Sequence, residues 1–314
     1  MKLISVVTPC FNEEKSISIC HERIRSIFKE YKDKYKYEHI ICDNNSTDST
    51  FEKLREIAKL DKNVKVIRNS RNYGVLRNNY NGIMASKGDA VVLLLPVDLQ
   101  DPPELIPEFI KHWEKGYQIV YGLRKKRREI FWVAILRKIY YRVLSAIANI
   151  NYPADAGDFQ LVDRVVLDAI KKTYIADPFM RMSTFDVGFD SIGIPYTWEK
   201  RKFGKSNVGI INMMLQGLDG ITSFSNLPIR ATIVFGILVS FLSFLFAILN
   251  WILVLLAIVP KGGQGIITLI SGIFILGGVQ IFSIGIVGEY VVRVLNQVRG
   301  RPHVIERERI NFEE

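Results

Sequence analysis

Two carboxylates and an amide stand directly after an apolar run: Asp98, Gln100 and Asp101 follow residues 90–95. The run is typical of a buried strand, and Pro96 ends it because proline cannot donate to a central ladder. Mg²⁺ prefers oxygen ligands and commonly takes one or two carboxylates together with substrate phosphates. The spacing therefore favours a site for a metal ion and a nucleotide diphosphate. The alternative is a polar turn before a helix, with Asp101 as the N-cap and the next proline in the first helical position.

Three earlier segments repeat the same order of apolar strand, polar loop and helix. The expected strands cover residues 3–8, 39–42 and 64–67, and apolar residues at helical spacing follow each of them. With the strand at 90–95 the pattern occurs four times, which indicates βαβ units, a parallel sheet and right-handed crossovers. Ligands of such sheets bind beyond the carboxyl ends of the strands. The candidate site residues in these loops are Pro9, Phe11, Glu13, Asp43, Asn45, Asn72, Asp98 and Gln100.

The composition and the absence of two motifs limit the classes of function that the sequence supports. The net charge of +10 over 314 residues suits anionic partners, which include nucleic acid, lipid headgroups and phosphorylated substrates. No G-x-G-x-x-G follows the first strand and no G-x-x-x-x-G-K-[ST] occurs in the sequence, so a dinucleotide-binding domain and a P-loop NTPase are both disfavoured. The three cysteines share no metal-ligand spacing, and we expect reduced thiols in the core of a cytoplasmic domain.

Taken in their order along the chain, these motifs resemble the inverting glycosyltransferases of family 2, which have a GT-A fold. The resemblance is carried by residues 7–14, 43–50, 70–74 and 98–104. Within that family the sequence is most similar to the polyprenyl-phosphate glycosyltransferases, the group of dolichol-phosphate mannose synthase and the bacterial undecaprenyl-phosphate glucosyltransferases. The resemblance implies an α/β catalytic domain with a Rossmann-like, mostly parallel sheet.

The resemblance also implies roles for the loop residues. The nucleotide would be bound by Pro9, Phe11, Glu13, Asp43 and Asn72. Asp98 and Gln100 would hold Mg²⁺ or Mn²⁺ with the diphosphate, and Asp98 is a catalytic residue. The sequence departs from the family pattern at two positions. Pro96 stands where an acidic residue is usual, and Asn44 stands where the family has a second acid after Asp43.

A basic segment at residues 124–142 carries eight arginines and lysines among aromatic and aliphatic residues. This mixture favours an interfacial helix on an anionic leaflet. Nucleic-acid binding and a solvated run of charge are the alternatives. Because arginine makes forked contacts with phosphate, Arg124, Arg128 and Arg142 are the candidates for binding an acceptor phosphate.

Two later stretches complete the candidate site. The resemblance places Asp158 near the sugar, where this catalytic residue would orient a sugar hydroxyl or the attacking phosphate; the alternative is a cap or turn before a helix at 162–172. Residues 200–206 match the family's basic Arg-x-x-Gly-x-Ser loop. There Arg201 is assigned as a catalytic residue and Lys205 as a nucleotide ligand, both at the leaving diphosphate. Ser206 supports them and is grouped with the residues of the acceptor phosphate.

The carboxyl-terminal third predicts a membrane anchor. Residues 231–259 and 262–288 form uncharged stretches of 29 and 27 residues, and a spanning helix needs about 20. Arginines flank the pair, so the positive-inside rule places both ends and the catalytic domain in the cytoplasm of a bacterial inner-membrane protein. The expected parts are a GT-A domain at 1–206, an interfacial amphipathic helix at 207–228, two transmembrane helices at 229–290 and a basic cytoplasmic tail at 291–314. Small residues in the helices favour a homo-oligomer.

The implied reaction moves one sugar from a nucleotide diphosphate, with UDP-glucose favoured, to undecaprenyl phosphate in the bilayer. The acceptor oxygen is already an anion, so no strong base is needed, and the four histidines lie in no catalytic pattern. Positioning and charge stabilisation would lower the barrier, and direct displacement would invert the anomeric centre. The alternatives are a GDP-mannose-dependent mannosyltransferase and an inactive membrane scaffold of the same fold. A nucleic-acid partner is not expected, and a polysaccharide synthase would need more helices.

Overall fold

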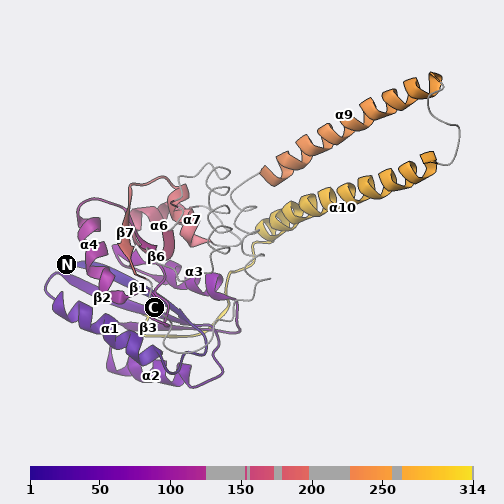
Figure 1. The fold of residues 1–314 in the computed structure, drawn as a ribbon. Coiled ribbons are helices and arrows are strands. Elements are labelled where there is room, and N and C mark those ends of the chain that lie inside the picture. Colours follow the sequence, from indigo (N-terminus) through magenta and orange to yellow (C-terminus); the bar gives the residue numbers. More distant parts are fainter. Residues whose placement is uncertain (125–152, 154–155, 173–178, 198–226, 257–263, 313–314) are drawn as a thin grey trace. The chain divides into compact units, whose positions relative to one another are not determined.

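The computed structural model describes residues 1–124, 153, 156–172, 179–197, 227–256 and 264–312 (Figure 1). The chain divides into two compact units. The first comprises Met1–Gly209 together with Gly300–Glu314, and the second is Ile210–Arg299. The first unit contains the sheet and the candidate site, and the second contains two long helices.

The first unit is built on a mixed sheet in which eight strands are described. They are β1 (Lys2–Cys10), β2 (Tyr35–Asp43), β3 (Val64–Asn69), β4 (Ala90–Val92), β5 (Ile119–Arg124), β6 (Ala156–Asp163), β7 (Ser191–Tyr196) and β8 (Glu306–Ile310). Their order across the sheet is β7-β5-β6-β4-β1-β2-β3-β8. β4, β1, β2 and β3 are parallel neighbours, and β5 is parallel to β7. β6 is antiparallel to both β4 and β5, and β8 is antiparallel to β3. The mostly parallel α/β sheet of the sequence analysis is confirmed.

Helices cover both faces of this sheet. They are α1 (Ile17–Glu30), α2 (Thr50–Leu60), α3 (Val75–Ala85), the short 3₁₀ helix η1 (Pro103–Leu105), α4 (Ile106–Glu114), α6 (Arg164–Lys171) and α7 (Met180–Asp186). Side chains alternate between the faces of a strand. Accordingly, Val6 and Ile41 belong to the buried cluster that includes the apolar sides of α1, α2 and α4. On the other face α3 packs closely, since a Cβ at Gly82 would lie 2.7 Å from Val7 Cγ1.

The four predicted strand–loop–helix repeats are present, but the fourth strand ends at Val92 and not at residue 95. Two further corrections concern the residues that follow. The helix expected at 162–172 begins only at Arg164, where Asp163 caps it by accepting a hydrogen bond from Val165 N (2.9 Å). Asp158 therefore lies within a strand, β6, and not in a turn. Asp101 is also not a helix cap, because Pro102 precedes η1 and Leu105 precedes α4.

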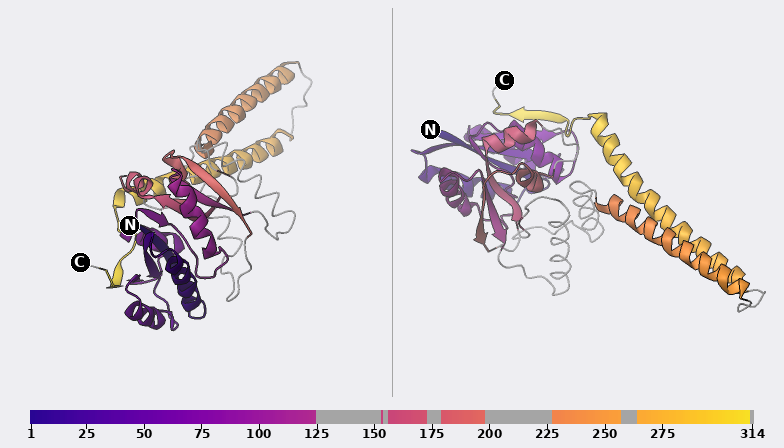
Figure 2. Two further views of the ribbon diagram at one scale, coloured as in Figure 1. Left: turned by 90° about the vertical axis from the view of Figure 1, so that its left-hand side faces the viewer. Right: turned by 90° about the horizontal axis from the view of Figure 1, so that it is seen from above.

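The end of the chain forms a strand where the sequence analysis expects only a basic tail. Within 291–314, the helix α10 (Gln264–Arg299) continues to Arg299 and β8 then pairs with β3 at the edge of the sheet (Figure 2). Charged residues dominate β8, so its sequence has no apolar alternation that would predict a strand.

The second unit contains α9 (Leu227–Leu255) and α10. Both are long and apolar enough to cross a membrane by length and composition. Their spanning windows are Ile229–Phe246 and Ile275–Arg299, and no residue in either window is buried within the protein. Large apolar side chains on both helices, such as Phe241 and Phe282, are therefore exposed. The predicted interfacial helices at 124–142 and 207–228 lie outside the described residues, apart from Arg124 at the end of β5 and residues 227–228, which form the start of α9.

Candidate active site

Two hydrogen bonds join the loop after β1 to the loop after β2 and to the first residue of α2. Asn12 N donates to Ser46 Oγ and Glu13 N donates to Thr50 Oγ1, each over 2.9 Å. Phe11 precedes these contacts and is 38% exposed, so its ring is available to a ligand. The carboxyl ends of the two parallel strands thus bring together the predicted nucleotide residues Pro9, Phe11, Glu13 and Asp43.

Asp43 is the buried acid of this edge. Its carboxylate accepts a hydrogen bond from Ser46 N (3.2 Å) and lies 3.6 Å from Arg68 Nε. Burial raises the pKa of the Asp43 carboxyl, and the contacts with Ser46 and Arg68 offset that rise only in part. A carboxylate that has lost water in this way gains from any further donor that a ligand supplies.

A network of asparagine amides holds the loop after β3. Asn44 Nδ2 donates to Asn72 Oδ1 (2.9 Å), while Asn44 Oδ1 accepts from Asn69 Nδ2 (2.9 Å) and Tyr73 N (3.0 Å). Asn69 Nδ2 also donates to Asn78 Oδ1 over 2.7 Å. Asn72 is exposed, but its amide oxygen is held in place by this network. The predicted nucleotide residue of the third loop is therefore connected directly to the residue that follows Asp43.

The turn after β4 presents Asp98 and Gln100, both half-buried. Asp98 Oδ1 accepts a hydrogen bond from Gln100 N (3.1 Å). Leu99 between them has a φ of +56° and is 4% exposed, so its side chain anchors the turn in the core. Among the described residues no three His, Cys, Asp or Glu side chains form a group that would hold a metal alone. One carboxylate and one amide nevertheless fit a hard cation that takes further oxygens from a diphosphate.

The second carboxylate of this segment, Asp101, belongs to a buried ion pair. It is 1% exposed, and Arg124 Nη2 donates to both of its oxygens (3.0 and 3.2 Å). Tyr196 OH donates to Asp101 as well and accepts from Arg124 Nε (3.0 Å). The guanidinium of Arg124, with 15% of its side chain exposed, thus links the turn after β4 to β5 and β7. Phosphate binding by Arg124 stays a prediction, and such a phosphate would have to share this guanidinium with Asp101.

Asp158 on β6 forms a forked ion pair with Arg181 on α7. Arg181 Nε donates to Oδ1 over 2.8 Å, and Nη2 donates to Oδ2. Burial raises the pKa of the Asp158 carboxyl, but Arg181 and Arg124 together lower it by more than burial raises it. The pKa of Asp158 therefore lies below its ordinary value. The pair lines a small cavity with Asn79, whose buried Oδ1 accepts no hydrogen bond within the described part of the chain.

The remaining predicted site residues lie outside the described residues. They are Arg128 and Arg142 of the basic segment, and Arg201, Lys205 and Ser206 of the later loop. Their roles stay predictions.

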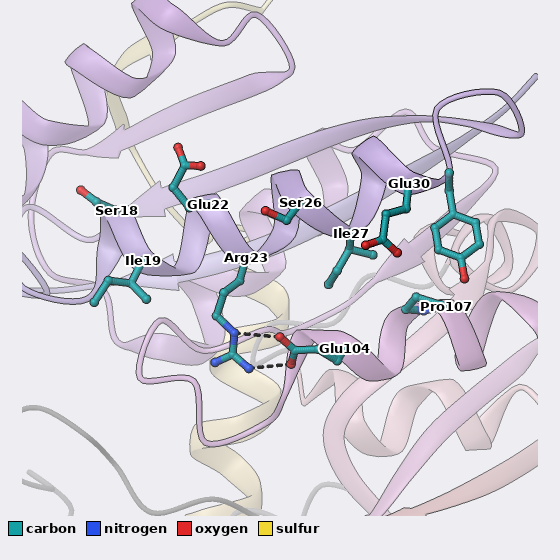
Figure 3. Close-up of a pocket in the computed structure, with 10 residues that line it drawn as sticks. Ser18, Ile19, Glu22, Arg23, Ser26, Ile27, Glu30, Glu104 and Pro107 are labelled. Carbon is teal, nitrogen blue, oxygen red and sulfur yellow. Dashed lines mark hydrogen bonds and ion pairs between the residues drawn. The ribbon is translucent and has the colours of Figure 1, made fainter.

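A larger groove lies between α1 and the segment of η1 and α4 (Figure 3). Its volume is about 670 Å³. Arg23 and Glu104 point toward each other there, and Arg23 donates to both oxygens of the carboxylate (2.9 and 2.5 Å). Because Glu22 and Glu30 add further negative charge, this groove does not suit a nucleotide diphosphate.

Comparison of the sequence with known proteins identifies its family. Residues 5–171, more than half of the chain, match the profile of Glycosyl transferase family 2. The chain belongs to glycosyl transferase family 2. This family 2 glycosyltransferase is 34% identical over 310 residues to the uncharacterized glycosyltransferase YkcC of Bacillus subtilis, covering 98% of this chain and 94% of that one. It is 31% identical over 310 residues to the SfII prophage-derived bactoprenol glucosyl transferase of Shigella flexneri, covering 96% of each.

Solved structures support the same fold. The glucosyl-3-phosphoglycerate synthase of Mycobacterium tuberculosis, solved with Mn²⁺, uridine diphosphate and phosphoglyceric acid, superposes with a TM-score of 0.52. The two proteins are 19% identical, and the match covers 69% of this chain and 75% of the mycobacterial chain. At this identity the likeness concerns the fold alone, and it confirms the GT-A fold that the motifs predict.

Three residues of the site were not predicted from the sequence of this glycosyltransferase. Arg181 and Tyr196 stand in no motif, and only the folded chain brings them to Asp158 and Asp101. In the sequence, Asn44 differs from the family only by replacing an acidic residue. Its side chain donates to Asn72, which a carboxylate in its place could not do.

Proposed function

We propose that this enzyme transfers a single sugar from a nucleotide diphosphate donor to a polyprenyl phosphate in a bacterial membrane. UDP-glucose is the favoured donor, undecaprenyl phosphate is the acceptor, and the anomeric centre is inverted. The observation that carries the proposal is the likeness along 96% of the chain to a bactoprenol glucosyl transferase, since the match includes both long apolar helices. Two such helices would anchor the protein in the membrane, where the acceptor stays.

The donor is assigned to the loops after β1, β2 and β3. Phe11 offers an exposed ring for a nucleobase, and Asp43 offers a buried carboxylate for its polar edge. Asn72 is held by Asn44 where the third loop begins. Lys205 and Arg201 are assigned to the diphosphate from the family pattern.

The residues after β4 are assigned to a divalent cation, Mg²⁺ or Mn²⁺. Asp98 and Gln100 would hold it, and it would neutralise charge on the leaving diphosphate. The mycobacterial protein with the same fold was solved with Mn²⁺ and uridine diphosphate, which supports a metal with the donor.

Asp158 is assigned to the reacting sugar. Its carboxylate is ionised and held by Arg181, so it accepts hydrogen bonds and cannot supply a proton. It therefore orients a sugar hydroxyl, while the acceptor phosphate attacks with an oxygen that is already anionic. Arg128, Arg142 and Ser206, with Arg124, are assigned to that phosphate. Positioning and charge stabilisation then lower the barrier without a general base.

The site would lie in the cytoplasm, with both chain ends on the same side of the inner membrane and the chain assembled as a homo-oligomer. Arg230 in the first turn of α9, together with Arg293 and Arg299 near the end of α10, supports this orientation. A mannosyltransferase that uses GDP-mannose is the second candidate, because the motifs at 7–14, 43–50, 70–74 and 98–104 also resemble those of dolichol-phosphate mannose synthase.

A transfer assay tests the proposal. Purified full-length protein in detergent receives undecaprenyl phosphate, Mg²⁺ or Mn²⁺, and radiolabelled sugar nucleotides one at a time, and label is counted in the organic phase. We expect label from UDP-glucose that is lost with EDTA. Label from GDP-mannose alone would replace the donor, and nucleotide binding without any transfer would favour an inactive scaffold.

A further inference from the structure

The last residues of the chain lie against the loop that carries Asn72. Residues 303–311, which we name the C-terminal strap, contain β8, the three residues before it and Asn311 after it. β8 pairs with β3, and the pairing continues past the end of β3, because Ser70 N donates to Ile305 O over 2.9 Å. Ser70 is the first residue of the loop 70–74, and its Oγ lies 3.0 Å from Tyr73 OH in the same loop.

The strap is fixed to α2, which precedes β3, and to α3, which follows this loop. Glu306 Oε1 accepts from Asn81 Nδ2 on α3 (2.6 Å), and Glu308 accepts from Arg55 Nη2 on α2 (2.8 Å). Asn311 Nδ2 donates to the carbonyl oxygens of Ala58 (2.7 Å) and Val64 (2.8 Å). Val304 is 9% exposed and His303 packs against the ring of Tyr80 with centroids 4.7 Å apart. These contacts place the strap on α2, β3 and α3 at once.

We infer that the C-terminal strap positions the nucleotide loop 70–74. The loop is held from two sides: the amide of Asn44 holds Asn72, and the backbone of Ile305 holds Ser70. The inference deepens the proposed function and rests on it where it assigns Asn72 to the nucleotide. It also gives the chain after α10 a role in the donor site, since only Gly300, Arg301 and Pro302 separate α10 from the strap.

The physical reason is the cost of ordering an exposed loop. Arg71, Asn72 and Gly74 are exposed, so burial of apolar side chains does not fix the loop. A loop that is ordered before the ligand arrives does not lose that conformational entropy on binding, and the affinity rises accordingly. The strap supplies part of this order through Ser70 and the end of β3.

Two neighbouring residues of the strap provide a matched test in the full-length protein. Val304 is buried and Ile305 is 58% exposed, so the same change to aspartate loosens the strap only at Val304. We expect Val304→Asp to raise the Kd for UDP about tenfold and to speed hydrogen exchange at amides 70–74. Ile305→Asp, which keeps its backbone carbonyl, should change neither. GDP is measured in parallel, so that the test does not depend on the base.

A second pair of variants keeps the test valid if Val304→Asp fails to fold. Glu306→Ala removes the acceptor of Asn81, and Arg307→Ala alters an exposed neighbour in the same strand. Faster exchange at 70–74 in Glu306→Ala but not in Arg307→Ala supports the strap. Equal exchange and equal Kd in each matched pair would overturn it, even if transfer is confirmed. If the wild-type protein binds neither UDP nor GDP, the proposed function fails, and hydrogen exchange alone still decides whether the strap orders the loop.

Discussion

The guanidinium of Arg181 donates hydrogen bonds to both carboxylate oxygens of Asp158 and so ties α7 to β6. The two side chains are similarly enclosed, at 21% and 22% exposure. Charge-assisted forks of this kind fix the plane of a carboxylate as well as its charge. In the proposed reaction Arg181 is therefore a positioning residue that keeps Asp158 ionised and aimed at the sugar.

Replacing Arg181 with Met should shift the acid limb of the pH–rate profile to higher pH. Burial raises the pKa of Asp158 and Arg181 lowers it, so removing the cation leaves burial as the larger influence. Because the folded-state pKa is depressed, the pair stabilises the fold above the ordinary pKa of an aspartate, and this stability is lost as the pH falls through the folded-state value. The variant should lose that contribution.

The profile is measured as kcat/KM for transfer from about pH 4 to pH 8, a range that begins at the ordinary pKa of Asp and covers the expected shift to higher pH. Arg181→Lys is the control, since an ammonium keeps the charge but not the fork, and its acid limb should stay close to that of the wild type. A uniform loss of rate in Arg181→Met, with the acid limb unmoved, would mean that Arg181 only supports the fold.

Replacing Asn44 with Asp should weaken nucleotide binding without adding bulk. Asn44 Nδ2 donates to Asn72 Oδ1, and a carboxylate would set two acceptors against each other there. Losing such a hydrogen bond costs about 1–3 kcal/mol, so we expect the Kd for UDP to rise by about fivefold or more.

The neighbouring Asn45→Asp is the matched control for this change. It adds the same charge to the same loop, and its φ of +63° is one that Asn and Asp both tolerate. Calorimetric titration of the two variants with UDP compares them directly. If Asn45→Asp weakens binding as much as Asn44→Asp, the effect comes from charge near the diphosphate and not from the amide network.

The same substitution should abolish transfer at Asp98 but lower the thermal stability of the protein at Asp101. Asp98→Asn removes the carboxylate assigned to the metal, so transfer should be lost while the melting temperature hardly changes. Asp101→Asn breaks a buried pair with Arg124, which typically destabilises a protein by about 3–5 kcal/mol, so it should lower the melting temperature clearly.

Transfer assays and thermal unfolding of both variants, with titration of Mn²⁺, check this contrast. Restored activity of Asp98→Asn at high Mn²⁺ would indicate that the residue contributes affinity for the metal. Full activity at ordinary Mn²⁺ would remove the assignment of Asp98.

The sequence predicted the parts of the site that follow from parallel strands. Pro9, Phe11 and Asp43 come together because the carboxyl ends of β1 and β2 meet at one edge, and a repeating strand–loop–helix pattern is enough to infer that. The pairing of Asp101 with Tyr196 is different in kind. It joins positions 95 residues apart, across strands whose order no local pattern specifies.

The places of β6 and β8 in the sheet could not be predicted from the sequence, for related reasons. β6 follows a long intervening segment and inserts antiparallel between β4 and β5, so the alternation of strand and helix does not reveal it. β8 reads Glu-Arg-Glu-Arg-Ile, and its place is set by pairing with β3 and by side-chain contacts at an edge, not by a buried face.

A chain truncated after Ser225 should bind nucleotide more weakly than the full-length protein, although its GT-A sequence motifs are complete. The truncation removes α9 and α10 but also β8, which exposes the edge of β3 and frees Ser70 N. A second variant replaces residues 227–299 with a flexible linker and keeps residues 300–314. We expect the second variant to melt at a higher temperature and to bind UDP more tightly than the truncation, while both transfer poorly to long-chain lipid because the apolar helices are gone. Equal melting temperatures and equal Kd values would show that the domain does not need its last strand.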